Sequence, residues 1–494
     1  MVDFASKIKP LRIEDPNEKD YLDISMLKDQ DNSEKEHVSE KDFDPFDYGN
    51  EVTSVPKMKN GLELTPEFEK AYLAIENTND CIFLTGNAGS GKTTFLRHWL
   101  SHTKKRTVVL SPTGMGALNL APIKATTIHK FFGFKPLPLT ESNIPRIPAE
   151  MLSKKERFYN AIDTIVIDEC SMVSSLMLQA IDSFYRINFD KDEPFGGIQI
   201  ILVGDLAQLP PVVPNDAERM YIEHRFKSKY FFDAEVLQRT GLKMIHFSRI
   251  FRQRDQDFVD YLNKIRMGTI NALELEQLNR KCYTNKVSQD ALVLCTVNKQ
   301  VQFINEKRLA KIEKPLITLR GEIEGDFNIK NCPVEEEIDV KEGCKIMCRN
   351  NDPEGKWCNG TVGEFVRQKD EDTIIIKIND EYHEMSRFKF EQTYFIFNPK
   401  EGKLESKSSA SFTAFPITLA YAISIHKSQG STYDEFKIDI GRGAFDSGQF
   451  YVALSRGTNL DGINFIEPIS MRDIIIDPIV SNFYKRMEEN NDIL

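Results

Sequence analysis

The chain has few cysteines and no long hydrophobic run, and both absences narrow the classes of protein to which it can belong. Its 494 residues include eight cysteines, several of them inside apolar runs, as expected of buried, reduced thiols. The four at positions 332, 344, 348 and 358 lack the CxxC pairs typical of zinc sites, which argues against a structural zinc ion. No stretch approaches the length of a membrane span, and the first residues, MVDFASKIKP, lack the apolar core of a secretion signal. We therefore expect an intracellular, cytoplasmic protein with no membrane partner, associated with the nucleoid if its host is bacterial.

Basic residues are fewer than acidic ones, 64 against 75, but much of this imbalance is local. The formal net charge is −11, and residues 1–50 alone contribute −7 through 14 acidic and 7 basic residues. Residues 1–60 are poor in periodic apolar positions, so we expect an acidic, disordered tail. Its aromatic residues Phe43, Phe46 and Tyr48 could dock a protein partner, although a solvated tail is the simpler interpretation. The near-neutral remainder can still carry a basic groove, so the charge does not exclude nucleic acid.

From residue 61 onward the pattern indicates an α/β fold in two parts. The first part, residues 61–238, contains four apolar runs separated by helical or loop segments, which predicts a parallel sheet covered on both faces. These runs are Cys81–Leu84, Val108–Leu110, Thr164–Ile167 and Ile198–Val203. A second α/β series occupies residues 239–318 and 411–494, with helices around Phe258–Ile265 and Val301–Ala310 and strands at Leu292–Cys295 and Phe436–Ile440. Residues 319–410 alternate in short strands and turns, which predicts a small β-barrel inserted into the second domain.

The most informative segment, residues 81–100, reads CIFLTGNAGSGKTTFLRHWL: a strand, a glycine-rich loop and a helix. The loop matches the phosphate-binding pattern, in which backbone N–H groups cradle phosphates at a helix N-terminus. Lys92 can reach the β- and γ-phosphates, and the Thr93 hydroxyl can hold Mg²⁺. We therefore expect ATP and Mg²⁺ as cofactors. The expected nucleotide-binding residues here are Gly86, Asn87, Ala88, Gly89, Ser90, Gly91, Lys92, Thr93 and Thr94.

Two later runs end in polar residues where parallel sheets place ligands. TIVIDECSMV supplies Asp168, which can hold Mg²⁺ through its water shell, and Glu169, which can polarise the attacking water. IILVGDLAQLPPVV supplies Gln208, which can hydrogen-bond a γ-phosphate, although a polar turn beside the site explains it as well.

Two arginines stand in apolar surroundings, where a charge needs a partner. Arg252 lies in FSRIFRQRD and Arg456 in YVALSRG. A γ-phosphate approached from a second domain would be such a partner. A structural salt bridge explains each arginine, taken alone, equally well.

Three further segments suit a nucleic-acid strand. HKSQGST places His426 and Lys427 beside Gln429 and Gly430, so it can touch both a phosphate backbone and the nucleotide. SPTGMGALNL follows the second strand with small residues, and TTIHKFFGF mixes a histidine, a lysine and three phenylalanines. Aromatic stacking suits single strands, but two of the three phenylalanines are more simply core residues.

In this order the blocks resemble the Pif/RecD-like branch of superfamily 1 helicases, the branch that moves 5′ to 3′. The resemblance spans about Leu62 to Ile466 and rests on GNAGSGKT, DECSM, GDLAQLPPV, FRQRD, HKSQGST and YVALSR together with SPTGMGALN and TIHKFF. CTVNKQVQFIN is similar to the family's pre-insertion motif, and WCNGTVGEF to the turn of its SH3-like insertion.

The resemblance implies two RecA-like motor domains with ATP between them, a wedge insertion at about residues 135–158 and an SH3-like insertion at residues 319–410. Arg252 and Arg456 would clamp the γ-phosphate, with Gln208 as its sensor, and Gln429 and Gly430 would join the nucleotide site. Single-stranded DNA would cross both domains. Its candidate contacts are Thr113, Gly114, Asn119, His129, Lys130, Phe131, Asn298, Asn359, His426 and Lys427.

The chain departs from the family at the residue that reads adenine. The family has a glutamine upstream of the phosphate loop, and here Glu69 stands at the expected position. An ionised carboxylate only accepts hydrogen bonds, so we predict relaxed nucleotide selectivity.

The expected function is an ATP-dependent 5′-to-3′ DNA helicase that separates strands by excluding one of them. Its catalytic residues would be Lys92, Glu169, Gln208, Arg252 and Arg456. Its substrates would be 5′-tailed, forked or structured DNA, in processes such as repair and recombination. Two alternatives remain: a translocase that displaces proteins with weak unwinding, and a nucleotide-switched binding module.

Overall fold

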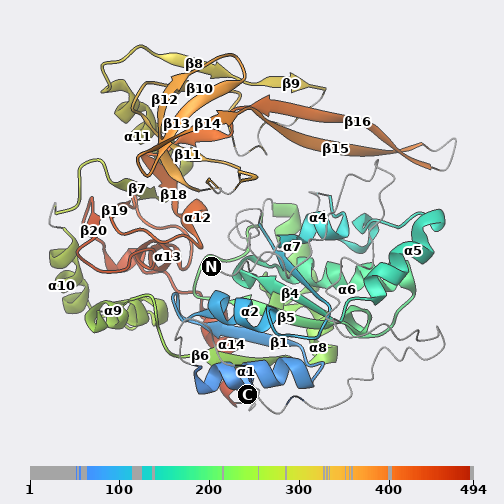
Figure 1. Ribbon diagram of the computed structural model, residues 1–494. Coiled ribbons are helices and arrows are strands. Elements are labelled where there is room, and N and C mark those ends of the chain that lie inside the picture. The colour runs from blue at the N-terminus through green and yellow to red at the C-terminus, as the bar shows by residue number, and fades with distance from the viewer. Residues whose placement is uncertain are drawn as a thin grey trace.

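The computed structural model describes residues 52, 55–56, 64–113, 125–135, 139–213, 216–253, 255–283, 286–325, 327, 329, 332, 334–350, 352–354, 356–357, 360–398 and 403–489. Within them the chain forms two parallel α/β domains and an antiparallel β insertion, which lies at the top of Figure 1. The predicted α/β class with two parallel sheets is confirmed. Of the described helices, none combines the length and the hydropathy that crossing a membrane requires.

The first domain is built on a six-stranded parallel sheet in the order β3-β2-β4-β5-β1-β6. Its strands are β1 (Ile82–Gly86), β2 (Thr107–Ser111), β3 (Thr126–Thr127), β4 (Thr164–Asp168), β5 (Gln199–Gly204) and β6 (Lys243–Phe247). Every residue of β1, β4 and β5 is buried. A parallel sheet covered on both faces needs such continuous apolar runs, which is why the sequence reveals these strands.

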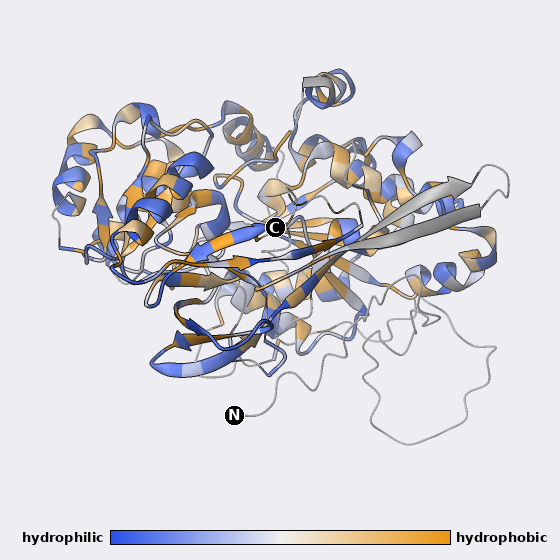
Figure 2. Ribbon diagram, turned by 90° about the horizontal axis from the view of Figure 1, so that it is seen from above, coloured by the Kyte–Doolittle hydropathy of each residue, from blue (hydrophilic) through white to orange (hydrophobic). Residues whose placement is uncertain are grey.

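Helices cover both faces of this sheet. Alternate strand residues point to opposite sides, so Phe83 and Ile165 join one core cluster while Ile82 and Val166 join another. The helices are α1 (Pro66–Asn77), α2 (Lys92–Leu100), α4 (Ile128–Phe132), α5 (Ala149–Asn160), α6 (Ser175–Phe189), α7 (Asp216–Arg225) and α8 (Glu235–Thr240). Many helical ribbons in Figure 2 change between hydrophilic and hydrophobic colours, as expected of helices that bury one face.

The second domain has a four-stranded parallel sheet in the order β18-β7-β19-β20. Its strands are β7 (Leu292–Cys295), β18 (Ala422–Ser424), β19 (Phe436–Asp439) and β20 (Ile463–Phe465). Its helices are α9 (Gln256–Met267), α10 (Ala272–Cys282), α11 (Asn298–Ala310), α12 (Ile425–Ser428) and α13 (Gln449–Leu454). The core of this domain extends to Ala88 and Leu209 of the first domain, so the two domains are in packed contact.

The inserted region is antiparallel throughout. It contains β8 (Ile317–Arg320), β9 (Glu322–Glu324), β10 (Glu337–Val340), β11 (Lys345–Cys348), β12 (Val362–Gln368), β13 (Thr373–Ile378), β14 (Glu381–Ser386), β15 (Phe388–Asn398), β16 (Lys403–Ala414) and β17 (Ile417–Leu419). In β13 the buried residues alternate with half-buried ones, as expected of strands with one face on a core. Strands β15 and β16 form a long hairpin on the side of the first domain (Figure 1). The likeness of the insertion to an SH3 barrel stays a prediction.

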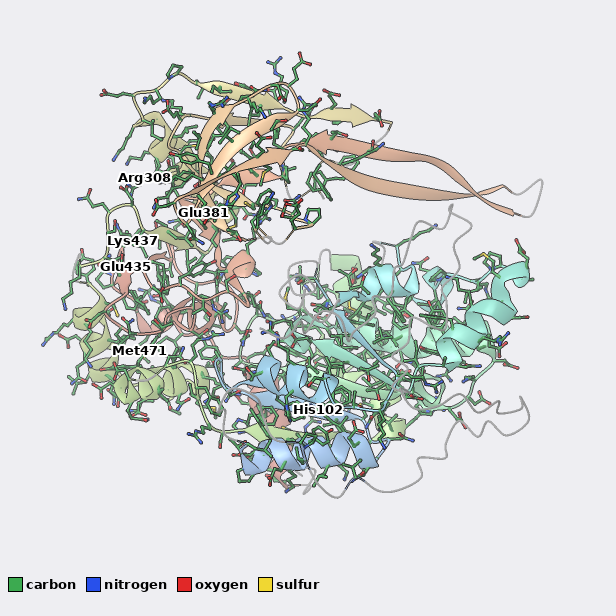
Figure 3. All side chains as sticks on the ribbon, viewed as in Figure 1. His102, Arg308, Glu381, Glu435, Lys437 and Met471 are labelled. Atoms are coloured by element: carbon green, nitrogen blue, oxygen red, sulfur yellow. The ribbon has the colours of Figure 1, made fainter. Side chains whose placement is uncertain are left out.

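One cation of the insertion and two of the second domain meet at the loop of residues 289 and 290. Lys345 of β11 donates to the Asp290 carbonyl at 2.7 Å, and Lys437 of β19 donates to the Gln289 carbonyl at 3.2 Å. Arg308 of α11 forms an ion pair with the Asp290 carboxylate at 2.7 Å, and Figure 3 shows Arg308 and Lys437 on the same side of the molecule. The insertion is therefore fixed to a loop just before β7.

Both ends of the described chain depart from the domain boundaries that the sequence indicates. Residues 1–60 were expected to be a disordered tail, and most of them lie outside the described residues. Val52 and Val55, however, pack against the core beside α1 and α2, and the Asn77 side chain bonds both the N–H and the carbonyl of Val52. At the other end, helix α14 (Pro478–Glu489) belongs to the segment assigned to the second domain, yet its apolar residues join a core of the first.

Candidate functional site

The glycine-rich loop between β1 and α2 turns tightly enough that two of its positions require glycine. Gly91 begins α2 in the left-handed conformation, with φ 84°. At Gly86, whose φ is 154°, an added Cβ would lie 2.5 Å from the carbonyl oxygen of Phe247. Only glycine fits such positions without strain or collision. The loop therefore brings its backbone N–H groups to the N-terminus of α2, where anions bind.

Lys92 is folded onto this loop. Its ammonium group donates to the carbonyl oxygens of Gly86 at 2.7 Å and Asn87 at 3.0 Å. Burial lowers its pKa, against the opposing effect of nearby carboxylates, chiefly Asp205 and Glu169. A buried cation needs such oxygen partners, and phosphate oxygens are of the same kind.

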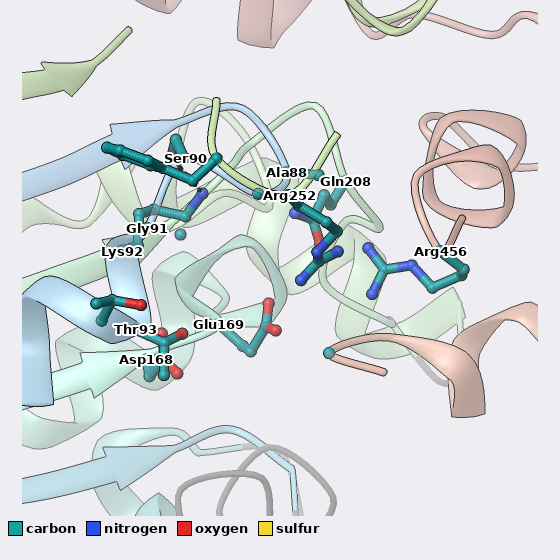
Figure 4. Close-up of a pocket in the computed structure, with 15 residues that line it drawn as sticks. Ala88, Ser90, Gly91, Lys92, Thr93, Asp168, Glu169, Gln208, Arg252 and Arg456 are labelled. Atoms are coloured by element: carbon teal, nitrogen blue, oxygen red, sulfur yellow. Dashed lines mark hydrogen bonds between the residues drawn. The ribbon is translucent and has the colours of Figure 1, made fainter. Parts of the chain in front are cut away.

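The loop opens into a cavity of ≈ 290 Å³ between the two domains (Figure 4). Residues of the phosphate loop, of the ends of β4 and β5 and of the second domain line it together. The lining residues are Ala88, Gly89, Ser90, Gly91, Lys92, Thr93, Thr94, Asp168, Glu169, Gly204, Gln208, Phe251, Arg252, Gly430 and Arg456. The cavity thus brings together the five residues predicted to be catalytic and most of those predicted to bind nucleotide.

Asp168 and Thr93 lie beside each other on the floor of this cavity (Figure 4). Burial, with the neighbouring charge of Glu169, raises the pKa of Asp168 to about 7. The raised pKa shows that nearby Lys92 and Arg97 do not offset the crowding of the two carboxylates, and a divalent cation supplies further positive charge to oxygen ligands of this kind. These residues therefore suit Mg²⁺ chemically, and their metal-binding role stays a prediction.

Glu169 has an unusual backbone, with φ 54° and ψ 41°. This left-handed conformation costs energy in residues other than glycine and is common at functional sites. Gln429 of the second domain donates to the Glu169 carboxylate at 3.0 Å and to the Gln208 side-chain oxygen at 3.3 Å. Gln429 was predicted to contact nucleotide, but it reaches the site through these two residues instead of lining the cavity.

Arg252 and Arg456 point their guanidinium groups toward each other across the cavity (Figure 4). Arg456 is only 2% exposed, and burial and the charge of Arg252 lower its pKa to about 10. Among the described residues neither arginine forms an ion pair: Arg252 donates to the Ser455 carbonyl, and Arg456 to backbone oxygens and the Ser455 hydroxyl. Two facing cations, one buried and one half-buried, that lack carboxylate partners favour the γ-phosphate interpretation over structural salt bridges.

Besides Gln429, three predicted nucleotide contacts are absent from the cavity lining: Glu69, Gly86 and Asn87. Glu69 is exposed on α1, whereas Phe68 points inward, and an added Cβ at Gly91 would lie 3.1 Å from its ring. Glu69 therefore does not line the cavity, and its role in reading adenine stays a prediction. The Asn87 side chain is also turned away from the cavity, since its amide donates to Asn263 of α9 at 2.6 Å.

The nucleic-acid candidates of the first domain are only partly described, because Gly114 and Asn119 lie outside the described residues. Thr113 follows β2, and His129 and Lys130 lie on α4 directly after β3, which pairs in parallel with β2. These three therefore share one edge of the sheet. Phe131 was expected to contact bases but is 5% exposed and packs edge-to-face on Phe132, so it is a core residue.

In the second domain three of the four candidates share an edge, and Asn359 lies outside the described residues. Asn298 begins α11 just after β7, and His426 and Lys427 lie on α12 just after β18. Because Ser424 of β18 pairs in parallel with Cys295 of β7, both helices start at the carboxyl edge of the same sheet. Lys427 and Asn298 are exposed and His426 is half-buried, so this edge offers polar groups to a ligand.

Three residues at the domain interface were missed. Asp205 follows β5 with no exposed surface, and both Arg266 of α9 and Tyr451 of α13 hydrogen-bond its carboxylate. Asp205 and Tyr451 stand inside the blocks GDLAQLPPV and YVALSR, so they were within reach of sequence reasoning. Nothing in the sequence indicates that they meet, because they are 246 positions apart.

Comparison with known proteins agrees with this geometry. A family model described as PIF1-like helicase matches residues 63–276. Over 436 residues the chain is 30% identical to the ATP-dependent DNA helicase Pif1 of Bdellovibrio bacteriovorus, an alignment that covers 86% of this chain and 93% of that protein.

Two crystal structures of Pif1 from Bacteroides are also similar to this chain. One is bound to single-stranded DNA and the other is in complex with ADP-AlF3 and single-stranded DNA. Each has a TM-score of 0.73 and 30% sequence identity, over 87% of this chain and 98% or 99% of the other. With two parallel domains around a phosphate loop and 30% identity to a relative along most of its length, the chain belongs to the PIF1-like helicase family.

Proposed function

We propose that this chain is an ATP-dependent DNA helicase that moves 5′ to 3′ along single-stranded DNA and separates a duplex by excluding one strand. The observation that carries the proposal is the cavity between the domains, where a phosphate loop faces the buried Arg456 and the half-buried Arg252, which lack carboxylate partners among the described residues. Such a cavity suits an anion between the arginines and the phosphate loop, and the γ-phosphate of ATP is that anion. The polarity rests on the resemblance of the ordered sequence blocks to the 5′-to-3′ branch.

The residues divide the chemistry among them. The phosphate loop and Lys92 would hold the β- and γ-phosphates, and Thr93 and Asp168 would hold Mg²⁺, which neutralises developing phosphate charge. Glu169 would accept a proton from the attacking water. Gln208, which shares the Gln429 amide with Glu169, is placed to register the loss of the γ-phosphate. Arg252 and Arg456 would stabilise the charge of the transition state.

Hydrolysis would drive movement because the DNA candidates lie on both sheets. His129 and Lys130 are at the edge of the first sheet, and Asn298 and His426 at the edge of the second. Opening and closing of the cavity would change the distance between these edges, so that the domains grip the strand alternately. The single-stranded DNA in both Bacteroides structures supports DNA as the partner. Forked or structured DNA is the proposed substrate inside the cell, with the acidic N-terminal segment available to a protein partner.

The test is DNA-stimulated ATP hydrolysis by the purified chain and two lysine variants. The unmodified chain should hydrolyse ATP faster when single-stranded DNA is added. Lys92→Ala should abolish hydrolysis, since it removes the cation that holds the β- and γ-phosphates. Lys485→Ala, a change at a 73% exposed position on α14, is the matched control and should hydrolyse ATP normally. Normal turnover by Lys92→Ala would refute the phosphate-loop assignment, and an unmodified chain that ignores DNA would refute the helicase proposal.

A further inference from the structure

Tyr451 is a buried residue of the second domain whose hydroxyl contacts the phosphate loop of the first. It lies in α13 with 2% of its surface exposed. The backbone N–H of Ala88 donates to this hydroxyl at 2.9 Å, and the hydroxyl lies 3.0 Å from a carboxylate oxygen of Asp205. An N–H group can only donate and a carboxylate can only accept, so the hydroxyl accepts from Ala88 and donates to Asp205. Both hydrogen-bonding roles of Tyr451 are thus used across the domain interface.

The Asp205 carboxylate is held by the second domain at a further point. Arg266 of α9 donates to it through Nε at 3.1 Å and Nη2 at 3.0 Å, and Asp205 is fully buried. Burial acts to raise the pKa of Asp205, but Arg266 and Lys92 hold it below its usual value. An ion pair buried this deeply is costly to separate, so this side of the cleft is a fixed contact between the domains.

Helix α13 is seated against the first domain at its start as well. An added Cβ at Gly448, which precedes the helix with φ 69°, would lie 2.2 Å from the carbonyl oxygen of Ala207. The helix therefore touches the first domain at Ala207 through Gly448 and at Ala88 and Asp205 through Tyr451. Contacts one turn apart fix both the axial position and the rotation of a short helix.

Arg456 takes its position from this helix. It follows Tyr451 by five residues, and its Nε donates to the carbonyl of Val452 in α13 at 2.9 Å. Its guanidinium is on the far side of the cavity from the phosphate loop and points toward Arg252 (Figure 4). A shift of α13 would therefore carry the guanidinium away from the site of the γ-phosphate.

We propose that Tyr451 is a positioning residue for ATP hydrolysis: by binding the Ala88 N–H and the Asp205 carboxylate, it holds α13 where Arg456 meets the γ-phosphate. The inference rests on the proposed ATPase function and assigns it a residue that does not line the cavity. Tyr451 contacts the backbone of the phosphate loop and not the nucleotide. Removal of the Tyr451 hydroxyl should therefore weaken stabilisation of the transition state and leave binding of the ground state unchanged.

The test uses Tyr451→Phe, which removes only the hydroxyl oxygen. Three quantities are measured on the full chain: kcat with saturating single-stranded DNA, the affinity for ADP, and the affinity for ADP with aluminium fluoride, which mimics the transition state. We expect kcat and the affinity for the mimic to fall together by about 10- to 100-fold, because a 1 Å misplacement of a catalytic group costs that much. The affinity for ADP, which has no γ-phosphate, should be unchanged.

Two further variants separate positioning from mere loss of packing. Tyr421→Phe removes another buried tyrosine hydroxyl, one that accepts from the Lys345 backbone N–H at 3.0 Å beside the insertion, and it should leave all three quantities unchanged. Gly448→Ala leaves the hydroxyl in place but pushes on the start of α13, and it should reproduce the selective loss. Tyr451→Phe combined with Arg456→Ala should be no slower than Arg456→Ala alone, because both changes act on the same contact.

The outcomes distinguish a failure of the proposed function from a failure of the role proposed for Tyr451. An unmodified chain without DNA-stimulated hydrolysis would refute the proposed function itself. An active chain in which Tyr451→Phe keeps its kcat, or loses ADP affinity in proportion, would overturn only the role of Tyr451. Full additivity with Arg456→Ala would overturn it as well.

Discussion

At the scale of single residues, the nucleotide site is marked by charges that the protein itself leaves unpaired. Arg266 is a structural arginine by contrast: its side chain is 8% exposed and forms an ion pair with Asp205 at 3.0 Å. Arg456 and Arg252 have only neutral oxygen partners among the described residues. Arginines with and without a carboxylate partner thus distinguish the residues that hold the domains together from those that await a ligand.

Changing Arg252→Ala should leave ATP binding nearly intact and slow hydrolysis by about 10³-fold or more, as expected of a residue that stabilises transition-state charge. Nucleotide affinity and DNA-stimulated turnover are measured side by side. Arg280→Ala serves as the matched control, because Arg280 is 76% exposed on α10. A loss of binding equal to the loss of turnover would mean that Arg252 is a ground-state contact.

The chain should hydrolyse ATP and GTP with comparable kcat/KM. The residue assigned to adenine recognition, Glu69, is exposed, and its inward neighbour Phe68 carries no hydrogen-bonding group. No described residue of α1 lines the cavity, so the helix supplies no donor–acceptor pair to tell adenine from guanine. Steady-state kinetics with both nucleotides decide the question, and strict use of ATP contradicts this account of the site.

The residues of the cavity could be predicted from sequence because each occupies the carboxyl end of a recognisable strand or a short spaced motif. Asp168 and Gln208 follow buried runs, and the topology of a parallel sheet brings such ends together. Glu69 lies on a helix, where each residue turns the side-chain direction by about 100°, so the sequence position alone does not decide whether it faces the cavity. Phe131 failed because stacking on bases and packing in a core use the same ring. The bond between Tyr451 and Asp205 has no local signal at all.

At the scale of elements, helix α14 departs most from what the sequence indicates. It follows the last strand of the second domain but packs into the first, where Phe483 stacks on Phe232 with ring centroids 4.1 Å apart and an interplanar angle of 10°. The Tyr484 hydroxyl lies 3.0 Å from the Thr85 hydroxyl of β1. The chain thus begins and ends its described fold in the first domain, with the second domain between.

Phe483→Ala should destabilise the first domain by about 3 kcal/mol, the usual cost of truncating a buried phenylalanine. Phe483 is 4% exposed, whereas Ile479 on the same helix is 40% exposed. Ile479→Ala should therefore change the denaturant midpoint little, and it is the matched control. Equal midpoints for the two variants would show that the α14 contact does not support the first domain.

The strands were predictable to different degrees for a physical reason. Strands β1, β4 and β5 are central, so their apolar runs are unbroken. The edge strands β3 and β6 were missed, because β3 has two residues and β6 mixes lysine and histidine into its run. The amphipathic pattern of α14 predicts a helix with one buried face, but it does not say which domain that face covers.

At the scale of the whole molecule, the cavity and the DNA candidates belong to one arrangement. In the first sheet only β2 stands between β4, which carries Asp168, and β3, which leads to His129. Across the cleft, Gln429 follows His426 closely and bonds Glu169. A change in the spacing between the domains would therefore alter the nucleotide site and the candidate DNA contacts together. The fixed contact of Asp205 with Arg266 lies within this interface, so the cleft would open about that point.

The central claim, a 5′-to-3′ motor that unwinds DNA, is tested most directly by ATP-dependent strand displacement on two duplexes of identical sequence. One carries a 5′ single-stranded tail and the other a 3′ tail of the same length, and Lys92→Ala serves as the inactive control. The account predicts that the unmodified chain displaces the strand of the 5′-tailed duplex only, and only with ATP. Displacement from the 3′-tailed duplex would contradict the polarity, and ATP hydrolysis without displacement from either would mean a translocase in place of a helicase.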